Sequence, residues 1–119
     1  MTQLPRKRYD LEERTAKFGE RVISFCGCVS RNRVTDPLVS QLVRSATSIG
    51  ANYMEANNAS SKKDFRNKIF ICKKEASETK YWLRMIARTN PDKADKCKIL
   101  WKEAHELTMI FAKIIHSSS

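Results

Sequence analysis

Apolar side chains recur along this chain at intervals of three and four residues, which is the spacing of one buried face on an α-helix. The first such series is Leu11, Thr15, Phe18, Val22, Phe25 and Val29. Three further series with the same spacing follow. The second is Val39, Leu42, Ala46, Ile49, Tyr53 and Ala56, the third is Phe65, Ile69, Cys72, Ala76, Thr79, Leu83 and Ile86, and the fourth is Cys97, Leu100, Ala104, Leu107, Phe111 and Ile114. No segment alternates apolar and polar residues as a half-buried strand would. The pattern therefore predicts an all-α protein.

Turn residues divide the chain into four helical segments. We expect helices at about 10–32, 36–58, 61–90 and 91–116. Helices of similar length that are joined by short connections favour antiparallel neighbours. The expected architecture is a single domain over residues 1–119, folded as an antiparallel up-down-up-down four-helix bundle.

Polar residues at the segment boundaries supply candidate helix caps. Asp10 and Glu13 are spaced to cap the first helix, and Asp36 stands at the N-cap position before a proline in the second. Ser61 and Asp64 have the spacing of a capping box at the start of the third helix.

Composition is that of a globular protein, with 41% hydrophobic and 30% charged residues and no apolar run long enough to span a bilayer. The basic cluster near the N-terminus has no apolar segment behind it, so we expect no secretory signal and a cytoplasmic location. The spacing of Cys26, Cys28, Cys72 and Cys97 matches neither a paired zinc motif nor a secreted disulfide framework. We expect free thiols packed among the helices.

Charge is uneven along the chain. The net charge is +10, and residues 61–90 alone contain nine basic and three acidic side chains. At about 100° per residue, one side of the third helix carries basic residues with an aromatic among them. These residues are Lys62, Lys63, Arg66, Phe70, Lys73, Lys80 and Arg84. The strip predicts contact with a phosphate backbone, and a solvated helix face is the alternative.

The third and fourth helices also carry more apolar side chains than one buried face requires. Those we assign to an oligomer interface are Ile71, Trp82, Met85, Trp101 and Ile110. Tryptophan and methionine are enriched at interfaces, which favours self-association. The alternative is that these residues widen the internal core.

No catalytic or metal-binding motif is recognisable. A di-iron bundle needs Glu-x-x-His, but lysine stands three residues before both His105 and His116. These histidines are also too far apart in sequence for an i, i+4 metal pair. We therefore predict no enzyme activity, no metal and no cofactor.

The acidic residues Glu55, Glu75 and Glu78 have no nucleophile or phosphate loop beside them. Because buried carboxylates need partners, we expect them to pair with Arg44 or with lysines of a neighbouring helix or subunit.

The run QLVRSATSIGANYMEANNASSKKDF, followed by KKEASETKYWL, closely resembles proteins encoded within intervening sequences of bacterial 23S rRNA genes. The accessory variability determinant proteins of diversity-generating retroelements share this fold family. The likeness extends from Tyr9 to about Ile115. The residues that carry it are Arg44, Ser45, Ser48, Gly50, Asn52, Glu55, Ala56, Ser61, Asp64 and Phe65.

This resemblance implies a bundle that assembles as a homopentameric ring with a basic surface. In the retroelement branch such a ring binds the reverse transcriptase and its template RNA. The likeness further implies that Trp82 is a packing or interface residue and that a set of polar residues is structural. That set is Arg44, Asn52, Glu55, Glu75 and Glu78.

The combined reading is a non-enzymatic accessory protein that binds RNA or an RNA–DNA intermediate, with a reverse transcriptase as a candidate partner and no membrane association. The alternative is a protein-interaction scaffold of the intervening-sequence type that binds no nucleic acid.

Overall fold

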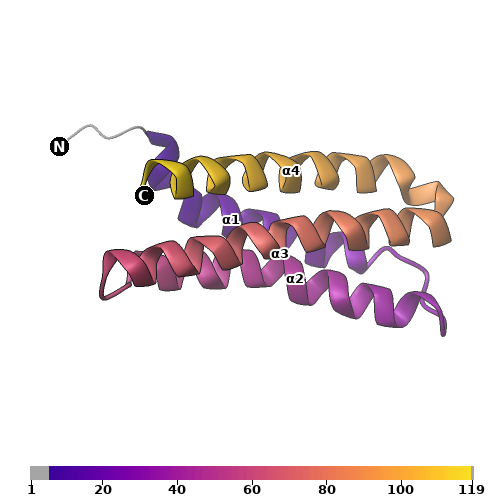
Figure 1. Cartoon of the computed structure of the whole chain (residues 1–119). Helices are drawn as coiled ribbons and strands as arrows, with labels where there is room; N and C mark the ends of the chain where they lie inside the picture. The colour runs from indigo at the N-terminus through magenta and orange to yellow at the C-terminus, as the bar shows by residue number, and fades with distance from the viewer. Residues whose placement is uncertain (1–5, 119) are drawn as a thin grey trace.

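Four antiparallel α-helices form an elongated bundle of 47 × 24 × 20 Å in the computed structural model (Figure 1). The structure describes the backbone of residues 6–118 and the side chains of residues 10–118. The helices are α1 (Arg6–Cys26), α2 (Thr35–Asn57), α3 (Lys62–Thr89) and α4 (Ala94–Ser117). Residues 1–5, where we expected no secretory signal, lie outside the described part.

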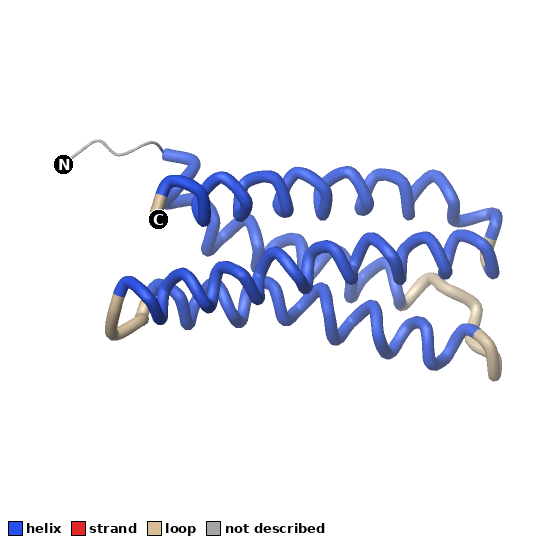
Figure 2. Tube along the Cα trace, viewed as in Figure 1, coloured by secondary structure: helices blue, strands red, loops and turns tan. Residues whose placement is uncertain are grey.

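All regular structure within residues 6–118 is helical, as the binary pattern predicts (Figure 2). Each helix packs against the next along the chain, whereas α1 and α4 touch only sparsely. None of the helices in this part of the chain combines the length and apolar character that crossing a membrane requires.

The first helix differs from the predicted range of 10–32 at both ends. It begins at Arg6, so Asp10 lies inside the helix and is not its cap. It ends at Cys26, because Gly27 is a poor helix former and the backbone tightens there. The amide of Cys28 donates to the carbonyl of Phe25 at 2.9 Å, a bond that spans three residues where an α-helix would span four.

The second helix begins at Thr35, which corrects the expectation that Asp36 would cap it. The side-chain oxygen of Asn32 accepts hydrogen bonds from the amides of Val34 at 2.8 Å and Thr35 at 2.9 Å. Asp36 instead lies in the first turn and pairs with Arg31 at 2.5 Å. Asn32 thus binds free amides just before and at the start of α2, a role that the sequence assigned to Asp36.

The third helix has the predicted cap. The hydroxyl of Ser61 accepts from the amide of Asp64 at 3.0 Å. The Asp64 carboxylate accepts from the amide of Ser60 at 3.4 Å, so the reciprocal contact falls one residue before the cap. The predicted fourth helix, 91–116, starts as a short 3-10 turn at Pro91–Lys93 before α4 begins.

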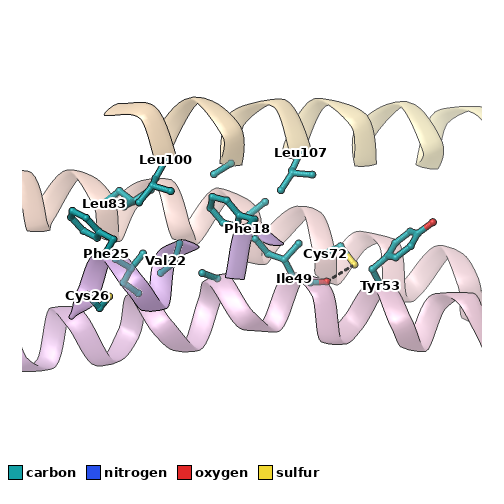
Figure 3. Packing of buried hydrophobic residues seen from close by; sticks show 14 of the residues in the cluster. Phe18, Val22, Phe25, Cys26, Ile49, Tyr53, Cys72, Leu83, Leu100 and Leu107 are labelled. Atoms are coloured by element: carbon teal, nitrogen blue, oxygen red, sulfur yellow. Dashed lines mark hydrogen bonds between the residues drawn. The ribbon is translucent and has the colours of Figure 1, made fainter. Parts of the chain in front are cut away.

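The predicted apolar stripes of all four helices meet in one core, in which Phe18 and Ile49 lie between helices (Figure 3). Val29 is buried as well, although it lies in the connection after α1. Two stripe residues near helix ends, Phe65 and Ile114, are half-buried. The periodicity therefore identifies the core more accurately than the helix ends.

All four cysteines are free, and one of them departs from the prediction because Cys28 is exposed. Burial raises the pKa of Cys26 and of Cys97 to about 11, and that of Cys72 to about 12. The Cys72 thiol also donates to the carbonyl of Ile49 at 3.5 Å (Figure 3).

Because the thiolate is the reactive form, we expect only Cys28 to react rapidly with a disulfide reagent at pH 8. The three buried thiols should react only after denaturation. An unfolded thiol ionises near pH 9, whereas the buried thiols of the folded protein ionise only at higher pH. Ionisation of these three thiols therefore favours the unfolded state, and folding stability should fall as the pH rises above about 9. Thiol titration of the native and denatured protein measures the difference, and more than one fast native thiol would contradict it.

Candidate nucleic-acid interface

Acidic side chains of α3 face α2, where they meet a cation. Arg44 donates from Nη1 to Glu75 at 3.1 Å, from Nε to Gln41 at 2.8 Å, and from Nη2 to Glu78. Hydrogen bonds to Glu78 and Glu75 raise the pKa of Arg44 above its usual value. The structure thus brings together three members of the predicted polar network, Arg44, Glu75 and Glu78. Of the two carboxylates, Glu75 is buried.

The remaining two members of that network lie apart from Arg44. Glu55 accepts from Lys68 of α3 at 2.7 Å, which is a pairing with a lysine of a neighbouring helix. Asn52 donates within its own helix, to the carbonyl oxygen of Ser48 at 2.8 Å and its hydroxyl at 3.1 Å. These contacts join α2 to α3 and order the α2 surface.

Removing Arg44 should destabilise the bundle, because Glu75 would stay buried without its cation. We expect Arg44→Ala to cost about 1–2 kcal/mol, less than for a fully buried pair because the Arg44 side chain is 45% exposed. In a Glu75→Gln background the same substitution should cost distinctly less. Urea unfolding of the four proteins measures this coupling, and equal costs in both backgrounds would show that Glu75 does not need Arg44.

Acidic side chains of α4 face α1 in the same way. Arg14 holds Glu103 with two bonds, at 2.7 and 2.9 Å, and Glu106 at 2.8 Å. These carboxylates raise the pKa of Arg14 above its usual value, with the hydrogen bond to Glu103 as the largest cause. Sequence reasoning did not find this pair, because its members are 89 residues apart.

The seam between α3 and α4 has the opposite character, since cations and aromatic rings meet there. The Lys80 ammonium lies 3.1 Å from Nδ1 of His105 and 5.2 Å from the ring centre of Trp101. Trp101 and His105 stack at 5.1 Å with an interplanar angle of 15°. Lys80 was predicted in the basic strip, and the structure adds two α4 rings beside it.

Arg66 lies at the other end of this seam. Its Nη2 donates to the carbonyl of Ile115 at 3.3 Å and its Nε to the hydroxyl of Ser118 at 3.3 Å. The guanidinium also lies 5.8 Å from the ring centre of Phe70. Arg66 therefore binds the end of α4 while its charge remains at the surface.

Most of the predicted basic strip is not neutralised within the chain. Among residues 10–118, no ion pair involves any of six cations, which are Lys62, Lys63, Lys73, Lys80, Arg84 and, from α4, Lys98. We use the name α3/α4 face for Arg66, Phe70, Lys73, Lys80, Arg84, Lys98, Trp101, Lys102 and His105. Lys62 and Lys63 are exposed in the first turn of α3, at the Arg66 end of the face.

The residues predicted at an oligomer interface are scattered. Trp82 and Ile110 pack against the core, and Nε1 of Trp82 is buried with no hydrogen-bond partner among the described residues. Ile71 and Met85 are half-buried. Trp101 is 38% exposed and belongs to the α3/α4 face. For Trp82 and Ile110 the packing favours the alternative that they widen the core.

Three α4 members of the face were not selected from the sequence, namely Lys98, Lys102 and His105. A usable signal was present, since Lys98 and His105 stand three residues before and four residues after Trp101. That spacing places Lys98, Trp101 and His105 on one side of a helix.

The comparisons with known proteins agree with this fold. The family model described as "23S rRNA-intervening sequence protein" matches residues 8–115. The chain is similar to a crystal structure described as a protein with unknown function from the S23 ribosomal protein family of Bacteroides thetaiotaomicron. The two share 32% identity with a TM-score of 0.79, over 87% of this chain and 96% of that one. No curated protein matches significantly. The extent of the family match shows that this chain belongs to the 23S rRNA-intervening sequence protein family.

Proposed function

We propose that this protein is a non-enzymatic accessory protein that binds RNA, or an RNA–DNA intermediate, through the α3/α4 face. One observation carries the proposal: the acidic residues Glu75, Glu78, Glu103 and Glu106 pair on the α2/α3 and α1/α4 seams, while within residues 10–118 the α3/α4 seam keeps cations without acidic partners. The net charge of +10 adds long-range attraction for a polyanion.

The spacing of the cations suits a strand of nucleic acid. Arg66, Lys73 and Lys80 follow one another at intervals of seven residues, which is about 10 Å along a helix. About three nucleotides of a stacked strand cover the same distance. These three cations can therefore contact phosphates about three nucleotides apart along one strand, and the aromatic rings of the face are available to bases.

We further propose assembly as a homopentameric ring, the form implied by the resemblance in sequence. Large apolar side chains that the monomer leaves more than half exposed support self-association; among them are Ile23, Met54, Ile99 and Met109. Light scattering should then give five times the chain mass of 13.7 kDa at a salt concentration that removes nucleic acid. A monomer at all concentrations would overturn this part of the proposal.

In the retroelement setting, the proposed partner is a reverse transcriptase that uses the same bound RNA. The two proteins should then co-purify with one enriched structured RNA, and nuclease should weaken their association.

The RNA-binding proposal is tested by purifying the protein at low salt without nuclease and sequencing any nucleic acid that co-elutes. Fluorescence anisotropy with a labelled RNA then gives the salt dependence. About four phosphate contacts on a single strand predict a slope of about −3 for log affinity against log salt. Protein free of nucleic acid, with no salt-dependent RNA binding, would overturn the proposal.

The second candidate is a protein-interaction scaffold that does not use nucleic acid. The observation that favours it is a groove of about 620 Å³ where α1 and α4 diverge, lined by Phe25, Leu100 and the exposed Ile99. A protein complex that survives nuclease and moderate salt would distinguish this candidate from RNA binding.

A further inference from the structure

The α3/α4 face contains a groove of about 530 Å³ beside Trp101. The bottom of the groove is apolar, because the lining residues Leu83 and Cys97 are buried. Its charged lining residues are all exposed cations, namely Arg84, Lys98 and Lys102. In the part of the chain that the structure describes, no acidic residue lines it.

Trp101 forms one wall of this groove, and within residues 10–118 its ring contacts are the Lys80 ammonium, 5.2 Å from the ring centre, and the stacked ring of His105. His105, one turn later, stacks on the ring at 5.1 Å. The groove is lined by Ala94, Cys97 and Lys98 from the preceding turns, so it opens on the side of the indole away from His105. Across the groove, the small side chain of Ala87 leaves room beside the ring.

The aromatic wall and apolar floor of the groove suit the flat base of a nucleotide. The cations at its rim suit the phosphates on either side of that base. We propose that the groove holds an unpaired base of the bound RNA strand, stacked on Trp101. Arg84, Lys98 and Lys102 contact the flanking phosphates. This inference rests on the proposed RNA binding and specifies its substrate class, because a base can enter the groove only when it is free of a duplex.

Tryptophan fluorescence provides the direct test. The chain has two tryptophans, so Trp82→Phe leaves Trp101 as the only reporter. The probes are a single-stranded RNA of about 12 nucleotides and a duplex of the same length, since single-strand binding sites span about 4–16 nucleotides. We expect the single strand to quench Trp101 fluorescence and to bind about tenfold more tightly than the duplex.

Substitutions then separate stacking from charge. Trp101→Ala should weaken single-strand binding about 5- to 100-fold and leave duplex binding within about twofold, whereas Trp101→Phe should retain most of the affinity. Ile99→Ala is the matched control, because Ile99 is exposed on the opposite side of α4, and it should change neither. Lys73→Glu should weaken both RNAs alike, since Lys73 contributes charge without lining the groove.

The possible failures are distinguishable. If both RNAs bind equally and Trp101→Ala and Trp101→Phe leave that binding unchanged, the base pocket is overturned while RNA binding stands. If the wild-type protein binds neither RNA, the proposed function fails, and the inference with it. Circular dichroism of each variant establishes that the helices are intact, and Trp101→Phe keeps the test decisive if Trp101→Ala does not fold.

Discussion

The double charge reversal Lys73→Glu with Lys80→Glu is expected to abolish RNA retention at low salt while the bundle stays folded. Neither lysine forms an ion pair in the described part of the chain, and the hydrogen bond between Lys80 and His105 is replaceable by a carboxylate. Two phosphate contacts are lost and two repulsions replace them, so affinity should fall on the order of 100-fold. The slope of log affinity against log salt should flatten by about 1.4 for a single strand.

The matched control is Lys17→Glu with Lys96→Glu. It changes the net charge of +10 by the same amount, but both lysines line the groove between α1 and α4. Retained RNA binding in this control, with loss in the Lys73 and Lys80 variant, locates the contact on the α3/α4 face. Equal losses in the two variants would mean that total charge alone governs binding, and the assigned face would be wrong.

The interior of the fold was predictable because burial follows periodicity. Leu42, Ile49 and Leu83 were assigned to buried stripes, and each is completely buried. The helix ends were less predictable, since a cap depends on which side chain reaches a free amide. Asn32 reaches two amides at the start of α2, although Asp36 has equally good capping chemistry.

The candidate interface was predictable along one helix but not across two. The basic strip of α3 follows from helical geometry alone, since Arg66, Lys73 and Lys80 recur on one side. The contribution of α4 depends on which of its sides meets α3. A single sequence does not show how α4 is rotated about its axis relative to α3. The assignment of Trp101 to an oligomer interface stays a prediction, and its position beside Lys80 could not be read from the sequence.

For the same reason, the pairing of acidic residues between helices could be predicted only in part. The partners of Glu75 and Glu78 could be expected on a neighbouring helix, but the bond between Arg14 and Glu103 joins the first and last helices of the chain. It becomes visible only once the bundle brings those helices together. The segregation of acidic residues away from the α3/α4 face, which supports the proposed function, is therefore a property of the fold.

Replacing the core residue Phe18 by alanine should have the largest effect on stability. Phe18 is 1% exposed and lies within the cluster that α1 contributes to the bundle (Figure 3). Phe→Ala in a core removes apolar contacts and leaves a cavity, at a cost of about 3–5 kcal/mol. A domain of this size is stable by only about 5–15 kcal/mol, so we expect a midpoint of thermal unfolding about 10–20 °C lower.

Phe70→Ala is the matched control for this loss, because it deletes the same ring from a position that is 48% exposed on α3. We expect it to cost less than about 1 kcal/mol, since a half-exposed ring loses little burial. Urea unfolding of both variants gives the comparison. If Phe18→Ala costs no more than Phe70→Ala, α1 does not pack on the core through Phe18. A large difference supports a bundle in which α1 packs on α2 and closes the core through Phe18.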